Sequence, residues 1–164
     1  MLKNNLTGLA WTHNLEHIFR YLDIYCRMIE NFNNIYFLIL HILVTGLFSV
    51  YLVRIIFAPE GLVKEFNVDR SAIYLVRFIG TFAFGFFLIG IYIIFRPGGP
   101  EGTWVYFYLI FIISAAQLLY ESLFYFKLID KDLEAKNSLT DLGLSVFMVV
   151  SSAILIWGLC DKIY

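Results

Sequence analysis

The chain has 164 residues, of which 60% are hydrophobic and only 15% are charged, and its formal net charge is -1. Soluble domains are typically about 45–50% apolar and about 25% charged, and so short a chain cannot bury this much apolar surface away from water. Nucleic-acid binding calls for a basic patch that this charge balance does not provide, so the expected partner for the apolar surface is a lipid bilayer.

The N-terminal segment, residues 1–34, predicts an amphipathic helix. Apolar side chains recur on one face at helical spacing, and charged side chains of alternating sign occupy the opposite face. The apolar face comprises Leu15, Ile18, Phe19, Leu22, Tyr25, Ile29 and Phe32. The charged face is not strongly basic, so attraction to anionic lipid does not explain it. The helix could lie in the membrane interface, or its apolar face could pack on the rest of the chain or on a partner protein.

Residues 13–17 match the H-x-x-E-H pattern of one metalloprotease class. In that chemistry His13 and His17 would bind zinc from one helical face, and Glu16 would act as the general base. The chain lacks the sizeable soluble domain that such a protease needs, so we predict no catalytic residue here. Whether the chain is an enzyme stays open, and a membrane enzyme of unknown class is the weakest of the alternatives. A peripheral metal site at His13 and His17 is the alternative. Cys26 and Cys160 lie far apart and predict two small buried side chains.

Four long apolar runs follow, at about residues 35–57, 72–95, 104–126 and 142–160. Each run provides the roughly 20 residues that a helix needs to cross about 30 Å of hydrocarbon. The runs must be helical, because lipid offers no hydrogen-bond partner to an unpaired backbone group. The sequence therefore predicts an all-α, membrane-embedded four-helix bundle over residues 35–164, preceded by the amphipathic N-terminal helix.

Proline and glycine mark the breaks between these runs. Residues 58–61 (APEG) end the first span, because proline cannot donate a backbone hydrogen bond and glycine favours helix ends. Residues 97–102 (PGGPEG) predict a tight turn, so the second and third spans are expected to form an antiparallel hairpin. Trp104, Tyr106 and Tyr108 follow the turn, where an interfacial aromatic belt is expected.

Charged residues inside a span are costly and usually face protein or water. In the expected hairpin, Arg77 of the second span and Glu121 of the third span lie at matching height. Arg54 and Asp141 approach the same level, and Gln117 lies one helical turn before Glu121. We therefore predict a polar cluster of these five residues near one membrane face, with Arg77–Glu121 as its best pair.

Two interpretations of this cluster are open. In the favoured one, Arg77 and Glu121 form a structural ion pair that orients the bundle, while Arg54 snorkels to the headgroups. In the other, Glu121 titrates and Arg77 holds an anionic or carbonyl group, so that the cluster binds a lipid-like, quinone or proton ligand. We predict no cofactor, and a bound lipid or quinone is the ligand compatible with this site. His41 is expected to hydrogen-bond a neighbour, because no other span offers a second histidine for haem.

Small side chains on the second and fourth spans predict close helix packing, since they let two backbones approach. On the second span they are Gly80, Thr81, Gly85 and Gly90, with Thr81 and Gly85 at small-xxx-small spacing. On the fourth span they are Ser145, Ser151, Ser152 and Gly158.

From residue 43 to residue 157 the layout resembles the DoxX-like group of small four-helix membrane proteins. The matching features are IIFAP at residues 55–59, LVKEF at residues 62–66 and RFIGTFAFG at residues 77–85. The resemblance implies a four-helix bundle and an accessory role near quinone-linked respiratory enzymes, and it transfers no catalytic residue.

The expected function is that of a non-catalytic integral membrane subunit, which assembles with other integral membrane subunits of a larger complex. The expected location is a bacterial inner membrane or an organellar inner membrane. The alternative is a small binding or transport module that uses the Arg77–Glu121 cluster.

Overall fold

The computed structural model describes residues 22–131 and 139–164, and all regular structure within these ranges is helical. Four of the helices are long and apolar enough to cross a membrane. They are α2 (Ile35–Phe57), α4 (Ile73–Phe95), α5 (Trp104–Tyr125) and α6 (Leu139–Gly158). The prediction of an all-α four-helix bundle is confirmed, and the chain is a multi-pass membrane protein in character.

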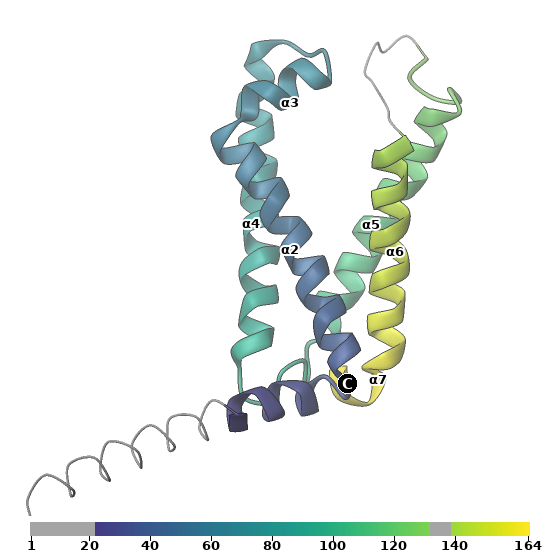
Figure 1. Ribbon diagram of the computed structural model, residues 1–164. Coiled ribbons are helices and arrows are strands. Elements are labelled where there is room, and N and C mark those ends of the chain that lie inside the picture. The colour runs from purple at the N-terminus through teal and green to yellow at the C-terminus, as the bar shows by residue number, and fades with distance from the viewer. Residues whose placement is uncertain (1–21, 132–138) are drawn as a thin grey trace, which may run out of the picture.

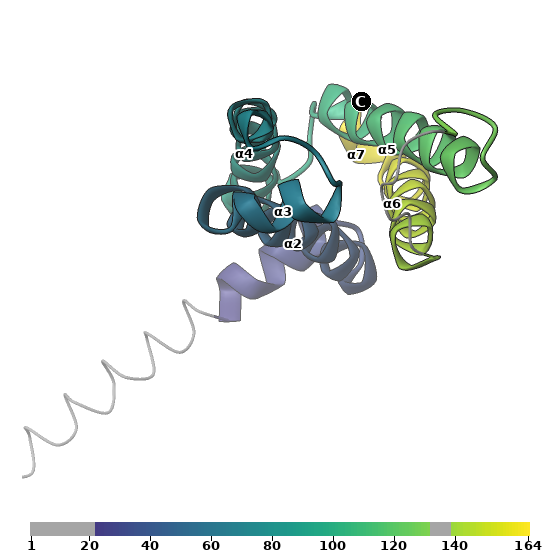
Figure 2. The ribbon, with the colours of Figure 1, turned by 90° about the horizontal axis from the view of Figure 1, so that it is seen from above.

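The four spans are arranged as two pairs. Helix α2 packs along α4 and helix α5 packs along α6, while α2 and α6 make the main contact between the pairs. The pairs come together at the end of the bundle where the C-terminus lies, and they diverge toward the opposite end (Figures 1 and 2). The predicted packing of α4 against α5 is wrong. The turn at residues 97–102 joins these helices, but each of them packs mainly against another span.

Glycines on α4 explain why this helix packs against α2. A Cβ built on Gly80 would lie 2.5 Å from Cγ2 of Ile55, and one built on Gly90 would lie 2.7 Å from Oγ1 of Thr45. Only the missing side chain lets the two backbones approach this closely. Thr81 is exposed and no described atom lies within 4 Å of a Cβ on Gly85, so the small-xxx-small pair does not make this contact.

The largest buried cluster gathers where the pairs meet. It draws on the start of α2, the end of α4, the start of α5 and the end of α6. Its members are Phe32, Leu38, Val44, Ile93, Ile94, Tyr106, Phe107, Ile110, Leu155, Leu159 and Ile163. The two pairs are therefore held together at one end of the bundle, and the other end depends on fewer contacts between them.

The N-terminal helix, described from residue 22 to residue 31, crosses this closed end of the bundle (Figure 1). Met28 and Ile29 pack on the buried cluster and Phe32 is fully buried in it. The apolar face could lie in the membrane interface or pack on the chain or on a partner. In the last turn of the N-terminal helix it packs on the bundle. The earlier part of the predicted helix, residues 1–21, lies outside the described residues.

Asn33 and Asn34 turn the chain from this helix into α2. Asn33 adopts the left-handed region with φ of 59°, which asparagine tolerates better than most residues. Its Nδ2 donates hydrogen bonds to the Gly158 carbonyl oxygen at 3.2 Å and to Asp161 Oδ1 at 2.5 Å. Oδ1 of Asn34 accepts from the backbone N–H of Tyr36 at 3.0 Å and caps α2.

Replacing Asn33 with glycine should loosen the N-terminal helix while preserving its turn. Glycine keeps the left-handed backbone at no steric cost but removes both side-chain hydrogen bonds, each worth about 1 kcal/mol or less at an exposed site. We expect faster hydrogen exchange over residues 22–31 and an unchanged rate in the middle of α4. Equal exchange in both proteins would show that these hydrogen bonds do not hold the helix down.

At the divergent end, α2 stops at Phe57 and a short helix, α3 (Pro59–Glu65), begins directly after Ala58. Proline suits the first position of a helix because its missing N–H would have no partner there. Leu62 and Val63 of this helix are buried. A 3-10 turn, η1 (Arg70–Ala72), then leads into α4.

The fourth span begins and ends earlier than predicted, at Leu139 and Gly158 rather than at residues 142 and 160. Asp141 lies in its first turn, where the positive end of the helix dipole stabilises an acidic side chain. After Leu159 the chain continues as α7 (Cys160–Ile163). Leu159 and Ile163 are both fully buried, so this short helix closes the core instead of extending the span.

Candidate functional site

Charged side chains from four helices lie toward the same end of the bundle as Tyr51 on α2. They are Arg54 on α2, Glu65 on α3, Glu121 on α5 and Asp141 on α6. We call these five residues, together with the two that hydrogen-bond Glu121, the Tyr51 cluster. It lies toward the divergent end, where α2 of one pair faces α5 and α6 of the other.

The Glu121 carboxylate joins α5 to α6. Nε2 of Gln117 donates to its Oε1 at 2.8 Å, and Oγ of Ser145 donates to its Oε2 at 2.6 Å. Gln117 and Glu121 lie on one face because residues four apart are neighbours on a helix. Hydrogen bonds to an ionised acceptor are stronger than neutral ones, so the half-buried carboxylate is well held on its own helix pair.

Arg54 forms an ion pair with Glu65, which ties the last turn of α2 to α3. Arg54 was predicted to snorkel to the headgroups, and its ion pair with Glu65 was not predicted. Both side chains are at least one-third exposed, and exposed ion pairs contribute about 0–1 kcal/mol. The pair therefore positions α3 more than it stabilises the fold.

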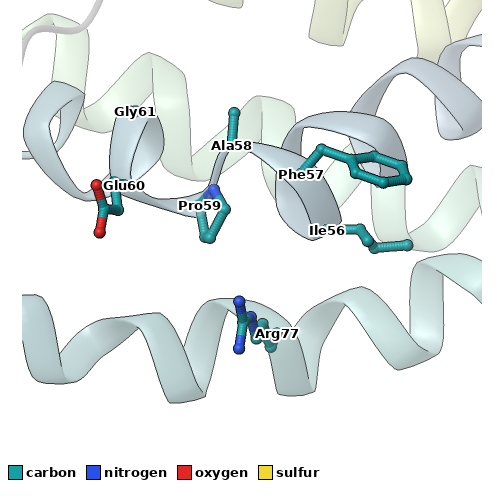
Figure 3. A pocket seen from close by; sticks show the side chains of 7 residues that line it. All are labelled: Ile56, Phe57, Ala58, Pro59, Glu60, Gly61 and Arg77. Carbon is teal, nitrogen blue, oxygen red and sulfur yellow. The ribbon is translucent and has the colours of Figure 1, made fainter.

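Arg77 lies away from the Tyr51 cluster, on the opposite helix pair from Glu121. Its side chain lines a hollow on α4, facing the corner where α2 passes into α3 (Figure 3). The proposed Arg77–Glu121 pair depended on α4 packing against α5, which the structure does not show. No carboxylate within the described residues forms an ion pair with Arg77, whereas Arg70 nearby pairs with Glu60 at 3.0 Å.

Of the five predicted residues, Gln117 and Glu121 are in direct contact, while Arg54 in the last turn of α2 and Asp141 in the first turn of α6 lie toward the same end of the bundle. Sequence reasoning missed Tyr51, Glu65 and Ser145. Tyr51 lies one turn before Arg54 on the same helix, and Ser145 belongs to the small-residue stripe of the fourth span, so helical spacing could have indicated both. Helical spacing could not have indicated Glu65, because its approach to Arg54 depends on the fold of α3.

His41 is the largest polar side chain that is fully buried in the closed end of the bundle. Its Nε2 lies 3.1 Å from the Gly90 carbonyl oxygen of α4, so the predicted hydrogen bond to a neighbouring helix is confirmed. The rings of Phe32 and Phe107 lie 5.2 Å and 5.6 Å from the imidazole, centroid to centroid. This enclosure by aromatic rings and one carbonyl fits a packing role for His41.

Tyr106 is buried beside His41, so it does not belong to the predicted aromatic belt. Trp104 and Tyr106 lie two residues apart, and two residues on a helix point in nearly opposite directions. The Tyr106 hydroxyl faces Thr45 but lies outside hydrogen-bond geometry. Trp104 is exposed, and the hydroxyl groups of Tyr108 and Tyr164 form a hydrogen bond with 2.6 Å between their oxygens.

Metal-binding chemistry finds no support among residues 22–131 and 139–164, where no group of three or more His, Cys, Asp or Glu side chains could hold an ion. His13 and His17 lie outside the described residues. Cys26 and Cys160 are free and exposed. The prediction that both cysteines are buried is therefore wrong, since each lies near an end of the bundle instead of between its helices.

The Tyr51 cluster can accept and donate hydrogen bonds and can hold charge near one end of the spans. It offers three carboxylates, one guanidinium, one phenol, one amide and one aliphatic hydroxyl, and all but the Glu65 carboxylate come from helices long and apolar enough to cross a membrane. Such groups suit recognition of a polar helix or of a polar headgroup. No protein-family model, curated protein sequence or solved structure matches this chain.

Proposed function

We propose that this chain is a non-catalytic integral membrane subunit that assembles with a larger membrane protein. The observation that carries the proposal is the position of Gln117 and Glu121, which lie about two turns and one turn before the end of α5. Gln117 is exposed and Glu121 is only half-buried. Polar side chains at such depth usually face protein or water, because exposure to hydrocarbon is costly.

A helix from a partner would cover the exposed parts of Gln117 and Glu121 and shield them from hydrocarbon. Interhelical hydrogen bonds stabilise membrane assemblies by about 0.6–2 kcal/mol each, and the two helix pairs diverge toward this end of the bundle (Figure 1). The resemblance to the DoxX-like group favours a quinone-linked respiratory enzyme as the partner, in a bacterial or organellar inner membrane.

The proposal is tested by purifying the tagged chain from its native membrane in mild detergent. We expect a defined membrane protein in stoichiometric amount. Replacing Gln117 and Glu121 with leucine should lower its yield about tenfold, which corresponds to about 1.4 kcal/mol of lost affinity. Leu119→Ala is the matched control, since Leu119 is exposed on the opposite face of α5 and should leave the yield unchanged.

Two further measurements keep this experiment decisive. The midpoint of thermal unfolding in detergent must be similar in the leucine variant and the wild type. A lower partner yield then reflects lost assembly and not a loss of folded protein. An isolated monomer with no stoichiometric partner from native membranes would contradict the proposal.

A second candidate is a small binding or transport module for a lipid-like, quinone or proton ligand. The observation that favours it is the Glu121 carboxylate, which Gln117 and Ser145 hold by hydrogen bonds between α5 and α6. Glu121→Gln and Tyr51→Phe each remove an ionisable group, so they should abolish ligand-dependent activity. Because both substitutions preserve side-chain size, the partner yield should stay intact. Loss of the partner without any ligand effect would favour the subunit instead.

A further inference from the structure

A hollow of about 390 Å³ lies where α2 turns into α3 and faces α4. Its lining consists of Ile56, Phe57, Ala58, Pro59, Glu60, Gly61 and Arg77. Figure 3 shows Arg77 on α4, across from the corner that Pro59 forms. The hollow thus combines the Arg77 cation, the Glu60 carboxylate, which is paired with Arg70, and the apolar side chains of Ile56 and Phe57, near one end of the membrane-spanning helices.

Arg77 brings a positive charge that the described chain does not neutralise. The neighbouring arginines, Arg54 and Arg70, each pair with a carboxylate, and the partner of Arg70 is Glu60 from the same hollow. Within the described residues no carboxylate lies in ion-pair range of Arg77. Arg77 lies seven residues after Arg70, where the candidate span begins, which is about 10 Å along the helix.

The apolar part of this lining is exposed at the surface of the protein. Ile56 is 51% exposed and Phe57 is 80% exposed. Gly61 adds room, because no described atom lies within 4 Å of a Cβ built on it. A cation beside exposed apolar side chains complements a molecule with an anionic head and a hydrocarbon tail.

We propose that this hollow binds the phosphate headgroup of a membrane phospholipid. The Arg77 guanidinium donates to phosphate oxygens, an arrangement that its planar fork favours over a lysine ammonium. One acyl chain lies along Ile56 and Phe57. This site is separate from the Tyr51 cluster and independent of the proposed function.

The test measures retention of a defined lipid by the purified full chain. The probe is phosphatidylglycerol, titrated into the detergent-solubilised protein and detected by native mass spectrometry, with a diacylglycerol of the same acyl chains for comparison. We expect one saturable phosphatidylglycerol adduct and at least about tenfold weaker retention of diacylglycerol. Arg77→Ala should weaken phosphatidylglycerol binding about tenfold, and Arg77→Lys should weaken it less.

Two further variants separate a built site from general attraction. Arg96→Ala is the matched control, because Arg96 ends the same helix at the opposite end of the bundle and stacks on Tyr92; binding should not change. Gly61→Leu fills the hollow without altering any charge and should weaken phosphatidylglycerol binding as Arg77→Ala does. It also serves as the second variant if Arg77→Ala fails to fold.

Three outcomes would overturn the proposal. Equal phosphatidylglycerol retention by wild type, Arg77→Ala and Gly61→Leu would mean that Arg77 only snorkels to bulk headgroups. Equal losses in Arg77→Ala and Arg96→Ala would indicate attraction by net charge. Competition by millimolar inorganic phosphate, with no preference for phosphatidylglycerol over diacylglycerol, would make the ligand a free phosphate and not a lipid.

Discussion

Gly90→Ala is expected to destabilise the protein by about 1–3 kcal/mol, the usual cost of overpacking a tight core. The new Cβ would lie 2.5 Å from the Tyr106 hydroxyl oxygen, and 2.7 Å and 2.8 Å from Oγ1 and Cγ2 of Thr45. Rotation of Thr45 gives little relief, because both of its branches already lie too close. The helices α2 and α4 must therefore separate, and the hydrogen bond between His41 and the Gly90 carbonyl lengthens.

Gly85→Ala is the control on the same helix. No described atom lies within 4 Å of a Cβ at this position, and alanine favours the helix over glycine by up to about 1 kcal/mol. Unfolding in mixed detergent micelles should therefore show opposite signs, with a loss of stability for Gly90→Ala and no loss for Gly85→Ala. Equal stabilities of the two variants would refute the close approach of α2 and α4 at Gly90.

Gly158→Ala is expected to weaken the junction between the helix pairs by about 1–2 kcal/mol, within the usual range for overpacking. A Cβ at Gly158 would lie 2.2 Å from both Cε1 and Cζ of Phe37 on α2. The cost is lower than at Gly90, because the ring of Phe37 is only half-buried and can move outward. As far as the ring does not move aside, α6 shifts relative to α2, and these two helices make the main contact between the pairs.

This second prediction is checked in the same unfolding experiment, with Gly143→Ala as its control on α6. No described atom lies within 4 Å of a Cβ at Gly143, so that variant should match or exceed the wild type in stability. Spin labels on α2 and α6 should also report a broader distance distribution in Gly158→Ala. An unchanged distribution together with unchanged stability would contradict the role assigned to Gly158.

The candidate site shows where sequence reasoning succeeds and where it stops. The spacing of Gln117 and Glu121 places both side chains on one helical face, whatever the rest of the fold does. The predicted pairing of Arg77 with Glu121 could not rest on local spacing alone, because it required sequential spans to pack along each other. Sequential elements are neighbours only about two-thirds of the time, and here the turn after α4 leads into the other pair.

The small residues give a similar result at finer scale. Gly80, Gly85 and Gly90 are equivalent in the sequence, since each permits close packing. In the fold, Gly80 lies against Ile55 and Gly90 lies against Thr45, while Gly85 has no such contact. Which glycine matters depends on the shape of the opposing helix, and that shape is absent from the local sequence.

The sequence by itself determined the four spans, their helical form and the breaks between them, because hydrogen bonding within a lipid-embedded helix is entirely local. Only the tertiary structure decided that α2 packs with α4 and α5 with α6, that the pairs join at one end, and that Ser145 of α6 holds Glu121 of α5. The physical reason is that these helices are apolar on nearly every side. Lipid is as apolar as their side chains, so steric fit and a few polar contacts select the packed faces.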